Sequence, residues 1–439
     1  MPYEDERAGL AAIRALADRG IVDEFHSDLA EPTGGPLPEL PPFEPYGVRG
    51  RARDRVLAID GSSVYEPIPG SLPSTEAGLV SLGMVIIDVK RLRDLERLPE
   101  SNSVNPRSLR DTENPTTLGT MLPGRNARKT DGTEPRMWFR QRINAELEEA
   151  SFGGETLAET LYALYELLPQ GRGVDCPSID CPEKVPVPPP GDVRDCPRCS
   201  GPVFLADGLR IHEQFIEEQS VEECHSRFRD ALEILALMNA VRYLADTPKG
   251  RQSLGDVAFV MDGPLAAFGT IAVLATAVRE ELDRLQRRLH DEDPPIDLLV
   301  MSGIKTGAFV DHAEELDRAP EPDTRIPPGT VWLPDNSYIR AHVVASAAAN
   351  PRAWGELTYF GRPVILKTSA NQRLVLNVAH PGADLPLTDA PAPAVLADAI
   401  ATADVLGMGR HQFLPLRRAH AHAAIPLRAG TDLIRSLAL

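Results

Sequence analysis

Two apolar segments that end in an aspartate constrain the fold of this chain more than any other feature. Residues 56–59 lead directly into Asp60, and residues 257–261 lead directly into Asp262, with a glycine after each aspartate. Apolar runs closed by a glycine predict buried strands that deliver their last side chains to sharp turns. Aspartate before glycine is also ordinary turn chemistry, and either pair alone is explained that way. Two such carboxylates in one chain favour a divalent-metal centre of the kind that cleaves phosphodiesters, because hard oxygen ligands hold these ions.

The composition indicates a folded chain with an acidic balance. With 439 residues and 42% hydrophobic residues, the chain can bury a substantial core and form about two or three structural units. The formal net charge of −18 argues against a general electrostatic attraction of the whole surface to nucleic acid. Any contact with nucleic acid therefore needs local basic patches, metal ions or a basic partner. No run of about eighteen apolar residues occurs, and the N-terminus is acidic where a signal peptide is basic. We expect no membrane segment and a cytoplasmic location.

The order of the segments predicts an α/β fold in which a mixed sheet is flanked by helices and carries one small insertion. Residues 1–47 contain an amphipathic stretch over 4–18 and a proline-rich arm that can wrap a partner. We expect the core in two parts, 48–171 and 206–439, with the insertion at 172–205 between them.

Apolar periodicity predicts the elements inside the core. After a first strand over 55–60, we expect an antiparallel return strand near 77–89, with Glu76 as a spare carboxylate near Asp60, and then a polar loop over 100–135. The predicted helices cover 141–168, 226–246 and 264–290. Further predicted strands cover 296–306, 338–344, 357–360, 364–367 and 373–378.

A basic segment begins in the polar loop and continues beyond it. Trp138 and Phe139 lie among its positive residues, and only Asp131 and Glu134 oppose them. In a chain this acidic, the segment is the best candidate for a surface that tracks phosphates and stacks a base on an aromatic ring. A solvated helix start with a tryptophan in the core explains the same residues. The basic residues are Arg125, Arg128, Lys129, Arg136, Arg140 and Arg142.

Four cysteines form the most specific motif of the sequence. The spacing C-x4-C, fourteen residues and C-x2-C joins Cys176, Cys181, Cys196 and Cys199. Two paired-thiolate knuckles predict a tetrahedral zinc site of the ribbon type, and four thiolates leave no position for a reacting water, so this zinc would be structural. Disulfides are the competing explanation, which a cytosolic chain with few cysteines disfavours. The fifth cysteine, Cys224, lies beside a histidine in a helical stretch, where packing explains it better than nucleophilic chemistry.

Three further residues are candidates for the divalent-metal centre. Glu233 is an acid in an otherwise apolar helical stretch, where a carboxylate is costly unless it meets a cation or metal, and pairing with Arg229 at a helix edge explains it equally well. Lys305 ends a predicted strand and is placed to meet a phosphate. His420 and His422 are two positions apart in the last predicted helix, so only one can reach a shared point as metal ligand or proton donor. A surface histidine is the alternative.

The order of these motifs resembles that of the NurA nuclease family. The motifs are a strand ending in Asp60-Gly-Ser, a strand ending in Asp262-Gly-Pro-Leu, a strand ending in Gly-x-Lys305-Thr, and a terminal helix with an Ala-His pair at His420. The resemblance covers roughly residues 48–439 in scattered motifs. It assigns the metal-binding acids of the family to Asp60 and Asp262, its helical glutamate to Glu233 and its terminal histidine to His420.

What the resemblance implies is an RNase H-like core, also compared with the Piwi domain, that uses Mn²⁺ or Mg²⁺. The implied activities are single-strand endonuclease and 5′–3′ exonuclease cleavage of DNA, and the implied assembly is a homodimer docked on the hexameric DNA translocase HerA. The cysteine insertion and the acidic balance depart from the family pattern and suggest a specialised branch in DNA end processing or phage defence.

The sequence therefore predicts a metal-dependent deoxyribonuclease with Mn²⁺ or Mg²⁺ at the acids and a structural Zn²⁺ at the cysteines. Asp60, Asp262 and Glu233 would hold the ions, and His420 and Lys305 would assist. A non-catalytic adaptor is the alternative from a different class. In that alternative the zinc ribbon and the arm bind a translocase, and the aspartates are only turns.

Overall fold

The computed structural model describes fourteen segments of the chain. They are residues 21–28, 40–46, 50–71, 73–91, 113–168, 173–217, 219–318, 325–344, 354–369, 371–379, 393–406, 419–424, 431–432 and 434–436. The helix predicted over 4–18 and most of the proline-rich arm lie outside these residues.

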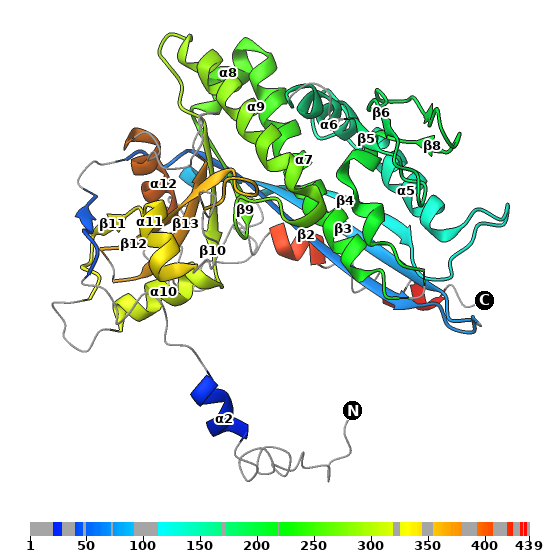
Figure 1. The fold of residues 1–439 in the computed structure, drawn as a ribbon. Coiled ribbons are helices and arrows are strands. Elements are labelled where there is room, and N and C mark those ends of the chain that lie inside the picture. Colours follow the sequence, from blue (N-terminus) through cyan, green and yellow to red (C-terminus); the bar gives the residue numbers. More distant parts are fainter. Residues whose placement is uncertain are drawn as a thin grey trace.

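A nine-stranded mixed sheet runs through the centre of the molecule (Figure 1). Its antiparallel meander of β2, β3 and β4 is joined to a parallel set, because β9 pairs in parallel with β2 and β10 pairs in parallel with β9. The remaining strands pair antiparallel beyond β10. In spatial order the strands are β1 (Glu44–Pro45), β11 (Thr330–Trp332), β12 (Gly361–Lys367), β13 (Arg373–Ala379), β10 (Leu299–Ile304), β9 (Val257–Asp262), β2 (Arg55–Pro67), β3 (Glu76–Asp88) and β4 (Glu113–Pro123).

Helices cover both faces of this sheet (Figure 1). The α-helices are α2 (Ile21–Asp28), α5 (Pro135–Glu149), α6 (Leu157–Glu166), α7 (Glu222–Asp246), α8 (Pro248–Leu254), α9 (Val273–His290), α10 (Ala308–Asp317), α11 (Asn336–Tyr338) and α12 (Pro393–Val405). Shorter helical turns are η1 (Leu205–Leu209), η2 (Ile211–Gln214), η3 (Gly269–Ala272) and the π-type turn η5 (Ile339–Val343). Within the described part of the chain, no helix has both the length and the apolar character needed to cross a membrane.

The burial of β2 explains why its sequence is almost continuously apolar. Leu57 and Ile59 pack in the cluster formed with α5, α6, α7 and α9 on one face of the sheet. Val56 and Ala58 pack in the cluster formed with α12 on the other face. Alternate residues of a strand point to opposite faces, so a strand covered on both sides needs apolar residues at every position.

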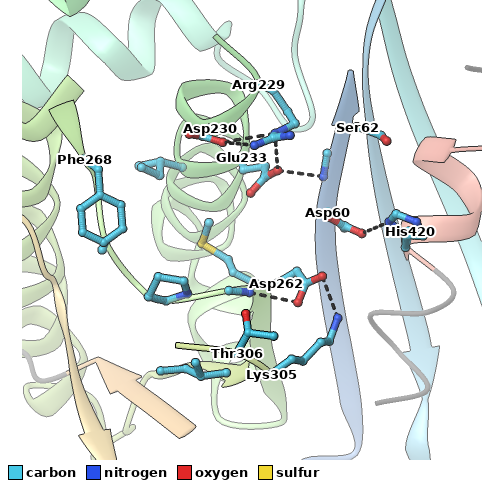
Figure 2. Close-up of a pocket in the computed structure, with 17 residues that line it drawn as sticks. Asp60, Ser62, Arg229, Asp230, Glu233, Asp262, Phe268, Lys305, Thr306 and His420 are labelled. Atoms are coloured by element: carbon cyan, nitrogen blue, oxygen red, sulfur yellow. Dashed lines mark hydrogen bonds and ion pairs between the residues drawn. The ribbon is translucent and has the colours of Figure 1, made fainter. Parts of the chain in front are cut away.

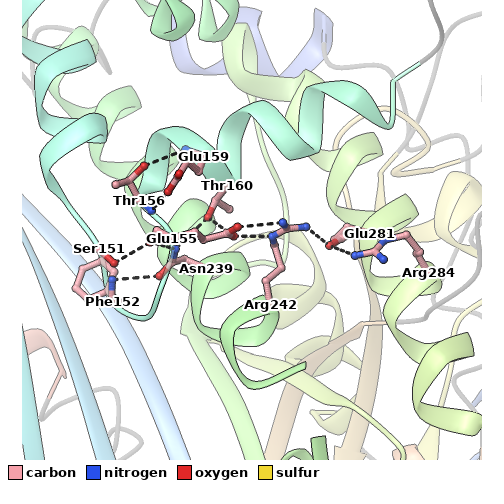
Figure 3. A network of polar contacts seen from close by, with 10 residues as sticks. All are labelled: Ser151, Phe152, Glu155, Thr156, Glu159, Thr160, Asn239, Arg242, Glu281 and Arg284. Atoms are coloured by element: carbon pink, nitrogen blue, oxygen red, sulfur yellow. Dashed lines mark hydrogen bonds and ion pairs between the residues drawn. The ribbon is translucent and has the colours of Figure 1, made fainter. Parts of the chain in front are cut away.

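A partly buried ion-pair network joins the segment before α6 to α7 and α9 (Figure 3). Arg242 of α7 donates to Glu155 at 2.6 Å and also pairs with Glu281 of α9. Glu281 is fully buried and accepts a second guanidinium from Arg284 at 2.6 Å. A buried carboxylate is tolerated when charged donors surround it in this way. The network therefore holds α7, the helix that carries Glu233, in a fixed position over the sheet.

Two elements of the meander side differ from the sequence expectation. β4 lies within the stretch predicted as a polar loop over 100–135, because its pairing with β3 supplies the order that its polar residues do not signal. The single helix predicted over 141–168 is two helices, α5 and α6. The second begins at a capping box in which Thr156 accepts from Glu159 N–H and Glu159 accepts from Thr156 N–H.

Three other expectations are also corrected. The helix predicted from 264 begins at Val273, after an irregular segment and η3. The stretch 338–344, predicted as a strand, is mostly helical in α11 and η5. Glu76 lies opposite Pro67 at the far end of the β2–β3 ladder and pairs with Arg125 at 2.7 Å, so it is not a spare carboxylate near Asp60.

Candidate functional site

The five residues predicted for the metal centre line one open cavity of about 550 Å³ (Figure 2). They come from five separate parts of the chain, namely β2, α7, β9, the turn after β10 and the helical segment 419–424. The residues are Asp60, Glu233, Asp262, Lys305 and His420.

The parallel pairing of β2 with β9 brings the two aspartates together. Ile59 lies in register with Met261, so the next residue of each strand, Asp60 and Asp262, emerges at the same level. Asp60 is 5% exposed, and the Asp262 side chain is 26% exposed. The local structures differ, however. Gly263 has a φ of +74° and turns the chain after Asp262, whereas β2 continues through Gly61 to Pro67, so the predicted turn after Asp60 is absent.

Gly61 serves a different purpose, which is to let α7 approach the strand. Its N–H donates to Glu233 Oε1 at 2.9 Å. A Cβ at Gly61 would lie 2.5 Å from that oxygen and 2.6 Å from Cγ of Arg229. Neighbouring residues of a strand point to opposite faces, so Asp60 points to one face of the sheet and Gly61 faces the other. Glu233 therefore reaches the site from the α7 face, opposite the face to which Asp60 points.

Gly83 allows the same kind of approach on the opposite face. It pairs with Asp60 in the β2–β3 register, and a Cβ there would lie 2.5 Å from the carbonyl oxygen of Ala419. The helical segment 419–424 can therefore lie directly against β3, with Ser81 Oγ donating to its backbone at Ala423. This contact places His420 at the cavity, whereas His422 does not line it.

Each of the two aspartates contacts a basic side chain. His420 Nδ1 lies 2.9 Å from Asp60 Oδ2, and Lys305 Nζ donates to Asp262 Oδ2 at 2.8 Å. Figure 2 shows both contacts on the β2 side of the cavity. The His420 and Lys305 side chains are 58% and 45% exposed, so both are accessible to a molecule entering the cavity.

The carboxylates of the site crowd negative charge into a partly buried space. Burial, and then the charge of Asp262, raise the pKa of Asp60 to about 6, although His420 and Lys305 oppose this shift. Burial, and then the charge of Asp60, raise the pKa of Glu233 well above its ordinary value, against the opposing effect of Arg229 at 3.7 Å. Raised carboxylate pKa values mean that the protein does not fully compensate these charges, so the cavity attracts a cation.

The carboxylates of the cavity are suitable ligands for divalent cations. Among the described residues, the four cysteines are the one group of three or more potential ligands that lie within 4.8 Å of one another. Asp60, Asp262 and Glu233 line the same cavity but are spaced more widely than such a group. All three offer the hard oxygen atoms that Mn²⁺ and Mg²⁺ prefer as ligands.

The four predicted cysteines form a compact cluster whose geometry can bind zinc. Cys176 Sγ lies 3.6 Å from Cys199 Sγ, and Cys181 Sγ lies 3.7 Å from Cys196 Sγ. A tetrahedral site with Zn–S bonds of about 2.3 Å requires sulfur separations of about 3.8 Å. The N–H of Gly201 points at Cys199 Sγ at 3.4 Å, as expected for the second knuckle.

Four short strands frame the cysteine cluster. They are β5 (Val174–Asp175), β6 (Lys184–Val185), β7 (Arg194–Asp195) and β8 (Pro202–Val203), and they pair as two separate ladders. The free sulfurs and the spacing both disfavour disulfides. Cys224 and His225, outside this cluster, are both buried. Burial raises the pKa of Cys224 to about 12 and lowers that of His225 to about 4, which fits packing rather than chemistry.

The basic segment does not form the expected phosphate-tracking surface, because its side chains are used within the fold. Arg140 makes two bonds to the fully buried Asp207, at 2.8 and 2.7 Å, and donates to Pro202 O in the ribbon. Arg136 donates to Pro177 O at 2.9 Å. Phe139 is fully buried and cannot stack on a base. These arginines instead anchor the cysteine ribbon to α5.

The remaining basic residues of the segment also have partners in the fold. The pairs are Arg125 with Glu76 at 2.7 Å, Arg128 with Glu134 at 2.7 Å, Lys129 with Gln141 at 3.0 Å, and Arg142 with Glu146 at 3.1 Å.

Sequence reasoning missed Arg229, Asp230 and Phe268 among the residues that line the cavity. Arg229 lies one helical turn before Glu233, so its i, i+4 spacing was a usable signal, but it was read only as a partner that would make Glu233 structural. Phe268 lies in the irregular segment before η3, where no periodicity marks it.

Comparisons with known proteins add little to this geometry. No protein-family model matches the sequence, and no curated protein matches it. The crystal structure of the NurA nuclease from Sulfolobus solfataricus aligns over 97% of this chain and 95% of that chain, with 10% sequence identity and a TM-score of 0.35. A TM-score this low carries no argument about function.

Proposed function

We propose that this chain is a metal-dependent nuclease that hydrolyses phosphodiester bonds of DNA at the Asp60 cavity. The observation that supports this most is the meeting of two in-register aspartates with Glu233 from the facing helix, in a cavity that leaves their charge uncompensated. Carboxylates gathered in this way are the ligands that Mn²⁺ and Mg²⁺ prefer.

In this proposal Asp60, Asp262 and Glu233 hold the ions. When bound, Mn²⁺ or Mg²⁺ supplies Lewis-acid activation of the attacking water and neutralises charge on the phosphate. Glu233 is oriented by the Gly61 N–H, which fixes one of its oxygens and leaves the other for a ligand. Asp60 is oriented by His420 in the same sense.

Lys305 and His420 are placed to assist the reaction. Lys305 bonds Asp262 and is nearly half exposed, so it can move to a phosphate oxygen when a cation replaces it at the carboxylate. His420 is held at Nδ1 by Asp60, which leaves Nε2 to exchange a proton with the departing oxygen. Arg229 lines the same cavity beside Glu233, and its guanidinium is paired with Asp230 at 2.6 Å.

The strand order is consistent with the RNase H-like core that the motif resemblance implies. Such a core has a three-stranded antiparallel meander whose first strand is followed in the sheet by two further strands parallel to it. The order β4-β3-β2-β9-β10 has this arrangement. The proposed catalytic acids lie on its two central strands, β2 and β9.

The test is cleavage of a labelled single-stranded DNA by the purified chain, with Mn²⁺ or Mg²⁺ omitted and then restored. We expect no cleavage without added metal, and a loss of about 100-fold or more in Asp60→Asn and in Asp262→Asn, because ligands of one centre act as a unit. The double variant should be no worse than either single variant.

Asp192→Asn, at an exposed position of the cysteine ribbon, is the matched control and should cleave normally. Melting temperatures should be unchanged or higher in the two active-site variants, because each removes a charge from a crowded site. Metal-dependent cleavage at an unchanged rate in Asp60→Asn would overturn the proposal. Absence of cleavage in every variant, the wild type included, would favour the adaptor alternative.

A further inference from the structure

We propose that Phe268 is a base-stacking platform that makes this site specific for unpaired nucleotides. Its side chain lines the same cavity as the carboxylates and is 38% exposed, which is unusual for a large aromatic residue. In Figure 2 the ring lies across the cavity from His420, with Glu233 and Asp262 between them. This inference rests on the proposed nuclease function and names a residue that selects its substrate.

The Phe268 ring is supported from behind by other aromatic rings. It meets Tyr359 edge to face, with ring centroids 5.5 Å apart and an interplanar angle of 83°. Tyr359 in turn packs on Trp354, with ring centroids 4.2 Å apart, and Trp354 is only 6% exposed. The exposed ring is therefore the outermost member of a packed aromatic group and not a mobile surface side chain.

The backbone just before Phe268 is also fixed. Ala267 N–H donates to Thr358 O at 2.7 Å, and Phe360 N–H donates to Leu265 O at 2.9 Å. Arg279 of α9, itself buried, donates to Tyr359 O at 2.8 Å and holds the partner segment in place. A ring fixed in this way loses little conformational entropy when a ligand covers it, which is what a stacking platform needs.

The chemistry of the surrounding residues indicates what the ring can bind. Lys305 can contact a phosphate group directly and the carboxylates can do so through a bound cation, whereas Phe268 offers only an apolar face. A nucleotide presents both a phosphate and a flat base, so one nucleotide can occupy both parts of the cavity. Inside a duplex, neighbouring bases cover each base face, so a protein ring can stack only on a base that is unpaired or terminal.

Neither aromatic residue of the basic segment lines this cavity: Phe139 is fully buried, and Trp138 is half-buried on α5. Phe268 therefore takes the stacking role that the sequence assigned to that segment.

The experiment measures binding of a short single-stranded DNA in the Asp60→Asn background, where cleavage does not interfere. One abasic site is moved along the oligonucleotide, and the dissociation constant is measured at each position. With Phe268 present, we expect one or two positions where loss of the base weakens binding roughly 5- to 150-fold, the equivalent of about 1–3 kcal/mol. In Phe268→Ala this sensitivity should disappear, and in Phe268→Trp it should persist.

Leu357→Ala is the control, since Leu357 is exposed and neighbours the same loop but does not line the cavity, so it should leave the abasic profile unchanged. In the cleaving enzyme, Phe268→Ala should raise KM for single-stranded DNA by a similar factor and leave kcat nearly unchanged. An abasic profile that is the same with phenylalanine and alanine at position 268, in a protein that cleaves DNA, would overturn this inference alone. A wild type that cleaves no DNA with either metal would overturn the proposed function and this inference with it.

Discussion

At the scale of single residues, Asp60 holds a negative charge where charge is costly. It is 5% exposed, it lies level with Asp262 on the next strand, and Glu233 approaches from the other face of the sheet. His420 compensates part of this charge but does not return the pKa of Asp60 to its ordinary value. Residues that serve only the fold are seldom arranged in this way, because removing one carboxylate would stabilise the chain.

The raised pKa of Asp60 predicts how stability depends on pH. The pKa is about 6 in the folded chain against an ordinary value of 3.8, so the folded chain binds this proton more tightly than the unfolded chain. The free energy of unfolding therefore falls as pH rises between about 4 and 6. Asp60→Asn lacks this charge, so its melting temperature in metal-free buffer should match that of the wild type near pH 4 and exceed it increasingly up to about pH 6. A stability difference that shrinks as pH rises would contradict this expectation.

Gly61 provides a second prediction at this scale. Gly61→Ala places a methyl group 2.5 Å from Glu233 Oε1, so the carboxylate must move away from the site. The displaced atoms belong mainly to the ends of side chains, so we expect cleavage and apparent Mn²⁺ affinity to fall at least about tenfold while the chain still folds.

Gly119→Ala is the matched control for this substitution. Gly119 also lies in the meander, but a Cβ there has nothing within 4 Å, so activity should not change. Equal rates and metal affinities in the two variants would show that the placement of Glu233 does not matter.

At the scale of elements, the cysteine ribbon depends on its metal and on α5. Its own apolar cluster is small, with Val174, Val185 and Val203 beside two of the cysteines. Four two-residue strands cannot form a stable unit from so little buried surface. Arg136 and Arg140 add bonds from α5 to its backbone, but these do not replace a core.

We therefore expect about one zinc ion per purified chain, with a contribution to folding on the order of 10 kcal/mol. Cys199→Ser should lose the ion and become sensitive to proteolysis within 172–205, while the sheet stays folded. Cys224→Ala, outside the cluster, should retain the ion. Metal analysis and limited proteolysis measure both effects. A folded, protease-resistant ribbon without zinc would show that the cysteines do not need the ion to fold. Cleavage should still require Mn²⁺ or Mg²⁺, because four thiolates leave no open position.

At the scale of the whole molecule, the charge of the chain opposes its proposed substrate. The net charge is −18, and the described part of the basic segment is paired within the fold. A polyanion approaching such a surface meets repulsion over distances of about a Debye length, roughly 8 Å at physiological salt. A partner that delivers the strand to the cavity would overcome this repulsion, and the motif resemblance suggests a hexameric ATPase of the HerA type acting on a homodimer.

We accordingly predict weak cleavage by the chain alone and strong stimulation by a hexameric ATPase of the HerA type. Rates measured with and without that ATPase, across a range of salt, test this directly. Stimulation should be largest at low salt, where repulsion of free DNA is strongest. Removing residues 1–39 should weaken assembly more than chemistry, because the packed residues, including Phe43 against Trp332, are retained. Equal rates with and without the ATPase at every salt concentration would count against a delivery partner.

The sequence by itself determined the features that depend on local pattern. The apolar runs before Asp60 and Asp262 located two central strands, because a strand buried on both faces must be apolar throughout. The cysteine spacing located a cluster whose sulfurs lie close together, because each knuckle is a local turn. Glu233 was found because an acid among buried apolar residues needs a reason to be there.

Tertiary structure alone decided the features that depend on contacts between distant segments. β4 has a polar sequence and becomes a strand only through its pairing with β3. The choice of His420 over His422 follows from the close contact at Gly83, which no spacing within the last helix reveals. The basic residues were correctly seen as a cluster, but whether an arginine meets solvent or a buried carboxylate such as Asp207 is fixed only when the ribbon folds against α5. Local sequence sets the direction and burial of a side chain within its own element, whereas its partners are set by which elements pack together.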